Sequence, residues 1–67
     1  MNQFSKNLRA AMNNKGMSAI DVAQGLGVTK ATVYRYLAGE FYPRLGKLEK
    51  LGNILGTSAS KLLEGCE

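Results

Sequence analysis

Apolar residues recur at helical spacing along most of the chain, and no stretch of the sequence shows the alternation typical of a half-buried strand. In residues 3–14 the apolar positions fall at i, i+4, i+7 and i+8, on one side of a helix; they are Phe4, Leu8, Ala11 and Met12. Asn2 is a suitable N-cap, and Gly16 is suited to a left-handed stop. The pattern predicts a first helix over residues 3–14.

A second helix is predicted over residues 18–26 and a third over residues 29–38. Ser18 and Asp21 have the spacing of a capping box, and Thr29 is a suitable N-cap for the third helix. The apolar side of the second helix consists of Val22, Ala23 and Leu26.

Only Gly27 and Val28 separate these two helices, so we expect them to cross at a steep angle, with Gly27 at positive φ. Residues 19–38 therefore have the spacing of a helix-turn-helix, with the small Ala23 where the helices touch. The apolar positions that would lock the two helices together are Val22, Leu26, Val28, Val33 and Tyr36.

Two more helices are predicted after a loop marked by Gly39 and Pro43. The fourth covers residues 44–55 and ends before Gly56; its inward residues are Leu45, Leu48, Leu51, Ile54 and Leu55. The fifth covers residues 58–64, with Ala59, Leu62 and Leu63 on one side. The fold class is thus all-α, a single domain over residues 1–67. Whether the glycines inside predicted helices, Gly25, Gly46 and Gly52, allow close packing or loosen the fold stays open.

Composition limits the chemistry. A chain of 67 residues has a small core, worth about 3–5 kcal/mol, yet its single cysteine, Cys66, excludes an internal disulfide. Cys66 is interpreted as an unimportant thiol, with an interchain disulfide as the lesser alternative.

Without histidine the usual zinc sets are absent, and the scattered acids form no acid/base pair, so we expect no enzyme, metal, cofactor or small-molecule ligand. The absence of a long apolar run or signal-peptide core favours a cytoplasmic protein.

The positive charge is unevenly distributed. Residues 1–50 hold eight Lys/Arg and three acids, a net charge of 8 − 3 = +5, whereas residues 51–67 hold Lys61 against Glu64 and Glu67, which gives 1 − 2 = −1. This distribution favours a polyanionic partner such as nucleic acid. Charge alone does not exclude a mildly basic soluble protein.

The chain resembles the lambda repressor and Cro family of DNA-binding domains over nearly its whole length. The resemblance rests on Leu8, Gly16-Met17-Ser18, Val22-Ala23, Leu26-Gly27-Val28-Thr29, Thr32-Val33, Arg35-Tyr36, Gly39-Glu40, Pro43, Leu45, Leu48, Leu55-Gly56, Ser58 and Leu62-Leu63. It implies a compact five-helix domain whose third helix enters the major groove of a two-fold symmetric double-stranded DNA operator, as a homodimer. The small size favours a stand-alone phage-type or plasmid-type regulator, expected to be a repressor, or the DNA-binding part of one. The resemblance also implies a dimer interface near the loop before the fourth helix and near residues 57–60. An exposed Phe41 would contribute to it, or Leu62 and Leu63 beyond the needs of the core, although ordinary core packing is the favoured interpretation of both leucines.

Two departures from the family pattern stand out. Ala19 occupies a position where members commonly carry a phosphate-binding glutamine, so that contact is expected to be missing. Met12 and Leu37 replace an arginine and a glutamate that form a buried pair in many members. Because replacing both charges by packed apolar residues can be neutral or stabilising, we predict that Met12 and Leu37 touch.

The third helix carries the expected base contacts. Val33, Tyr36 and Leu37 face inward, which leaves an outer face without carboxylates. Arg35 is the best candidate for bidentate hydrogen bonds to guanine, and Lys30 can reach a base or a phosphate. Ala31 permits close approach or contacts a thymine methyl, and Tyr34 packs on sugar and phosphate or on a base edge.

Phosphate contacts are expected at both ends of this helix. Thr29 would bind a phosphate together with the helix N-terminus, while Thr32 is divided between DNA contact and a local backbone bond. In the following loop, Tyr42 and Arg44 would donate to phosphates, and Lys47 is a weaker candidate. The rival interpretation is an adaptor or antitoxin-like protein-interaction module that keeps the same fold; the basic charge and the acid-free helix face count against it.

Overall fold

A computed structural model describes residues 2–66, which form five α-helices without a strand. The helices are α1 (Gln3–Lys15), α2 (Ala19–Leu26), α3 (Lys30–Ala38), α4 (Leu45–Ile54) and α5 (Ala59–Leu62). The predicted all-α fold class is confirmed, and α1 to α3 agree with the predicted ranges to within about one residue.

The predicted caps account for this agreement. Asn2 accepts the amide of Ser5 at 2.8 Å, Ser18 and Asp21 form the capping box, and Thr29 accepts the amide of Thr32 at 3.2 Å. Gly16 ends α1 in the left-handed conformation, with φ of 69°. Side-chain oxygens at the start and a left-handed residue at the end satisfy the backbone groups that a helix leaves free, so these ends are encoded locally.

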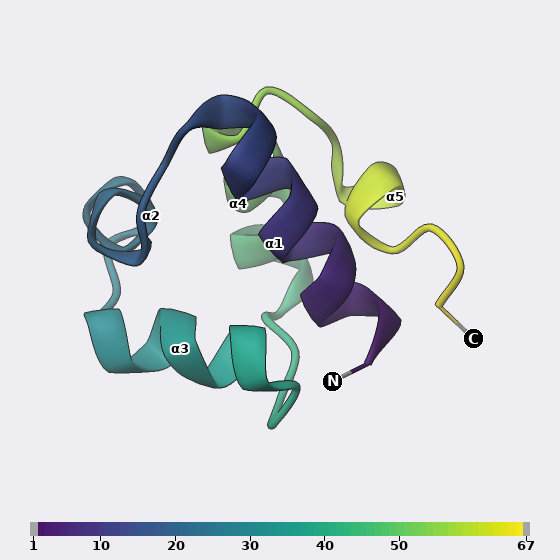
Figure 1. The fold of residues 1–67 in the computed structure, drawn as a ribbon, viewed down its shortest axis with the longest axis horizontal. Helices are drawn as coiled ribbons and strands as arrows, with labels where there is room; N and C mark the ends of the chain where they lie inside the picture. Colours follow the sequence, from purple (N-terminus) through teal and green to yellow (C-terminus); the bar gives the residue numbers. More distant parts are fainter. Residues whose placement is uncertain (1, 67) are drawn as a thin grey trace.

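The core lies between helices that are far apart in sequence. α1 packs against α3 on one side and α5 on the other, while α2 contacts α3 and α4, and α4 contacts α5 (Figure 1). The fully buried side chains are Phe4, Ser5, Leu8, Val22, Leu26, Val33, Leu51 and Leu62. Met12 and Leu37 are both buried in this same core, although their mutual contact stays a prediction.

Two leucines correct the predicted inward faces. Leu45 is 68% exposed: it is the first residue of α4, and in the first turn of that helix Leu48 is buried and Lys47 bonds to α2 instead. Leu63 is 39% exposed, because α5 ends one residue earlier and its apolar side does not continue. The fourth and fifth helices are accordingly shorter than predicted. Cys66 is half-buried and packs against the core.

The interior glycines have different surroundings. A Cβ on Gly25 would lie 3.1 Å from Cδ1 of Ile54, and one on Gly52 would lie 2.9 Å from the backbone carbon of Ser58. Gly25 and Gly52 therefore permit close packing of α2 on α4 and of α4 on the segment before α5. No atom would lie within 4 Å of a Cβ on Gly46.

Within residues 2–66, the side-chain hydrogen bonds between distant segments reach carbonyls at or just after the C-terminal end of a helix. The Asn2 amide donates to the carbonyl of Gly39, just after α3, at 3.4 Å. Asn7 donates to the carbonyls of Leu62 and Glu64 at the end of α5, at 2.9 and 2.8 Å. Lys47 donates to the carbonyl of Leu26, the last residue of α2, at 3.1 Å. Each bond satisfies an acceptor that the helix itself leaves without a partner.

Candidate nucleic-acid interface

The turn between α2 and α3 places α3 along one edge of the molecule. Gly27 has φ of 76°, and its amide and that of Val28 both donate to the carbonyl of Ala23. Figure 1 shows α2 end-on while α3 lies across the view, so the two helices cross steeply, as the short connection predicts. α3 packs on α1 and α2 only, which leaves its other side uncovered.

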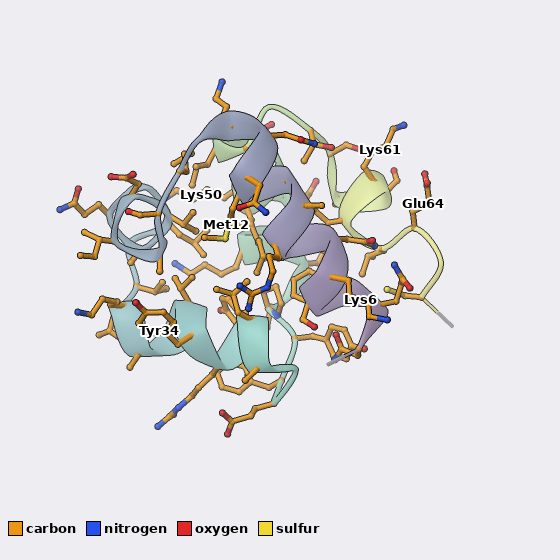
Figure 2. All side chains as sticks on the ribbon, in the orientation of Figure 1. Lys6, Met12, Tyr34, Lys50, Lys61 and Glu64 are labelled. Atoms are coloured by element: carbon orange, nitrogen blue, oxygen red, sulfur yellow. The ribbon has the colours of Figure 1, made fainter. Side chains whose placement is uncertain are left out.

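The inner and outer faces of α3 are the predicted ones. Val33, Tyr36 and Leu37 are buried, and burial raises the pKa of Tyr36 above its usual range. The exposed residues are Lys30, Ala31, Tyr34, Arg35 and Ala38. Tyr34, labelled on α3 in Figure 2, is 54% exposed. The outer face thus offers an ammonium, a guanidinium, a phenol and two methyl groups, with no carboxylate.

Thr29 and Thr32 form a hydroxyl pair at the start of α3. The Thr29 hydroxyl oxygen accepts the Thr32 amide and lies 3.0 Å from the Thr32 hydroxyl oxygen. One hydroxyl donates to the other, so one hydroxyl proton of the pair stays available. The pair therefore provides one donor beside the positive end of the helix dipole, an arrangement suited to an anion. The Thr32 hydroxyl bonds locally to the Thr29 side chain, whereas a local bond to the backbone was expected from the sequence.

Aromatic contacts hold the loop after α3. The ring of Phe41 meets that of Tyr36 edge-on, with centroids 5.2 Å apart, and the ring of Tyr42 packs on Phe4 at 5.4 Å. Pro43 is buried, while Tyr42 remains 53% exposed and Arg44 is exposed. Both predicted phosphate donors of this loop are therefore accessible on a backbone that core aromatic rings hold in place.

Lys47 differs from the other predicted site residues. Its side chain is half-buried, and its ammonium donates to the end of α2. The predicted site residues of α3 thus lie on one exposed face, and those of the loop lie after the C-terminal end of that helix. Lys47 instead bonds to the helix-turn-helix itself. No sequence signal indicated this contact, because the lysine lies 21 residues from its acceptor.

Other kinds of site have no counterpart in residues 2–66. This part of the chain contains no pocket and no group of three side chains that could hold a metal ion. None of its helices combines the length and the apolar character that crossing a membrane requires.

Comparison with known proteins gives consistent results. The model of a family described as helix-turn-helix matches residues 8–62. The chain is 39% identical over 62 residues to a prophage-derived, uncharacterised transcriptional regulator of helix-turn-helix type from Bacillus subtilis, an alignment that covers 92% of this chain and 57% of that protein. It is 42% identical over 57 residues to a transcriptional regulatory protein of the same type from Pyrobaculum aerophilum, covering 85% of this chain and 23% of that protein. The chain therefore spans little more than half of one relative and about a quarter of the other.

Proposed function

Because this chain belongs to the helix-turn-helix family, we propose that it binds double-stranded DNA in a sequence-specific manner and regulates transcription, with α3 in the major groove. One observation carries the proposal: the uncovered face of α3 is exposed, free of carboxylates and equipped with donors. A solvated helix face commonly mixes both charge signs, whereas this face would attract phosphates along its whole length. The similarity to a prophage-derived regulator supports a phage-type regulator, and repression is the sign of regulation that we propose.

The residues divide into two roles in this proposal. Lys30, Ala31, Tyr34 and Arg35 contact base edges, and Arg35 is the main reader because its planar guanidinium can bind both acceptors of one guanine. Thr29, Thr32, Tyr42 and Arg44 contact phosphates on either side of the groove. Two chains bind one operator, since a helix of nine residues reads only a few base pairs.

Selection of bound sites from random duplex DNA tests the proposal. We expect enrichment of a two-fold symmetric sequence and an affinity for it that falls steeply with salt concentration. A chain that enriches no sequence and does not bind duplex DNA at low salt would overturn the proposal and favour the protein-interaction module.

Arg35→Ala and Arg44→Ala separate the two roles. Arg35→Ala should cost about 1–3 kcal/mol of binding free energy on the selected site and relax the preference at one or two base pairs. Arg44→Ala should weaken binding to all sequences alike and make the salt slope shallower by about one unit. Arg9→Ala, which removes an exposed arginine of α1, is the matched control. If Arg35→Ala binds selected and random duplexes as the native chain does, Arg35 reads no base.

A further inference from the structure

The carbonyl of Leu26 lies at the centre of the helix-turn-helix. Leu26 is the last residue of α2, and the two amides that follow it, those of Gly27 and Val28, both donate to Ala23, at 2.9 and 3.1 Å. Neither amide reaches the Leu26 carbonyl, which carries part of the negative end of the α2 dipole. Its partner is the ammonium of Lys47 at 3.1 Å, which comes from α4.

This bond connects the turn to a helix outside the motif. α4 contacts α2 and α5, and the loop of residues 39–44 joins it to the end of α3, so the Lys47 bond is a direct link from α4 to the start of the α2–α3 turn. Apolar contacts between α2 and α4, such as Ile54 against Gly25, have no strong directional preference. A hydrogen bond from a charged donor to one backbone oxygen is directional, and it acts three residues before the cap of α3, Thr29.

We propose that Lys47 is a positioning residue: by holding the Leu26 carbonyl, its ammonium fixes the α2–α3 turn and thereby the depth and angle at which α3 meets base edges. This inference rests on the proposed DNA binding, and it assigns Lys47 a role other than the phosphate contact expected from the sequence. Sequence discrimination requires base-edge hydrogen bonds within narrow distance limits, whereas attraction to phosphates tolerates small displacements. Loss of the bond should therefore reduce discrimination more than general affinity.

Lys47→Met tests the inference, because methionine keeps much of the apolar side chain and removes the donor. The control is Lys50→Met, which removes an equal charge from an exposed position on α4 (Figure 2). We expect Lys47→Met to lower the ratio of selected-site to random-site affinity by about fivefold or more, comparable to the loss of a base contact. Its salt slope should equal that of Lys50→Met. Lys47→Arg, which can still donate to the carbonyl, should retain discrimination.

A phosphate contact would give a different result: Lys47→Met would weaken both duplexes equally, with a salt slope about one unit shallower than that of Lys50→Met. This outcome would overturn the inference.

Hydrogen exchange without DNA separates the inference from the proposed function. In Lys47→Met the amides of Gly27 and Val28 should exchange faster than in Lys50→Met, because the turn opens more often, while α1 amides should be less affected. Unchanged exchange at the turn would refute the positioning role even if the chain binds DNA. If exchange accelerates but the native chain binds no duplex, the proposed function fails and the role of Lys47 in the turn stands.

Discussion

Two glycines of α4 show how differently one residue type can be used within one helix. A Cβ on Gly52 would meet the backbone of Ser58 at 2.9 Å, a distance that real Cβ contacts do not reach, so the chain before α5 passes directly over it. Gly46 is exposed, and no atom would lie within 4 Å of its Cβ. Gly52 thus has a packing role that Gly46 lacks. The sequence alone did not show whether these glycines serve packing, because the close neighbour of Gly52 belongs to another segment.

Alanine at these two positions should have opposite effects on stability. Gly46→Ala should raise the free energy of unfolding by about 0.5–1 kcal/mol, since alanine loses less backbone entropy in a helix. Gly52→Ala should lower it by about 1–3 kcal/mol, because the backbone of residue 58 must move away. Urea denaturation followed by circular dichroism measures both values. Equal stabilisation by the two substitutions would show that the segment before α5 yields without cost.

At the scale of an element, α2 has a pH-dependent N-terminus. The Ser18 amide donates to Oδ2 of Asp21 at 3.0 Å, and the Asp21 amide donates to the Ser18 hydroxyl at 3.2 Å. The amide of Ser18, followed by its hydroxyl, lowers the pKa of Asp21 below its usual value of 3.8. The carboxylate therefore contributes stability at pH values above the unfolded pKa. This contribution disappears as the pH falls through the lower folded pKa.

Asp21→Asn tests this contribution. At neutral pH the variant should be less stable than the native chain, because an amide accepts the Ser18 hydrogen bond less well and no longer complements the helix dipole. The difference should shrink below pH 3.8, where the native carboxyl also becomes protonated. Urea denaturation of both proteins at neutral pH and in a series below pH 4 measures how this stability difference changes with pH. A difference that does not change with pH would mean that ionisation of Asp21 plays no part.

Elements also differ in how much of them could be predicted. The starts of α1 to α3 depend on side chains within three residues of the cap, so the sequence was sufficient. The inward assignment of Leu45 was wrong because the spacing of apolar residues alone does not reveal that, in the first turn of α4, Leu48 is buried and Lys47 bonds to α2 while Leu45 stays exposed. On α3 the helical spacing of apolar residues separated the buried from the exposed residues, since this helix packs against both α1 and α2. The hydrogen bond of Lys47 could not be predicted from the sequence, because its acceptor lies 21 residues away.

Across the whole molecule, the polar bonds between distant segments connect the proposed interface to the rest of the fold. Asn2 bonds just after α3, and Lys47 bonds just before it, so both ends of the helix are held by residues outside the motif. The aromatic pairs of Phe41 and Tyr42 extend this support to the loop. A small core contributes little net stability, and these long-range contacts support α3 without a larger core.

The number of chains that bind one operator also depends on the molecule as a whole. Because α3 has only nine residues, we propose that two copies bind one operator with their α3 helices one helical turn apart, about 34 Å. We predict that two chains bind the selected sequence cooperatively, and that inserting about half a helical turn between its half-sites abolishes this cooperativity, because the second site then faces another side of the duplex. Analytical ultracentrifugation of the chain with each duplex gives the stoichiometry. Leu45→Asn should reduce cooperativity without changing the affinity for a single half-site, since Leu45 is exposed beside the loop where the interface is expected. One chain per selected site, or cooperativity that survives the insertion, would show that the chain recognises DNA as a monomer.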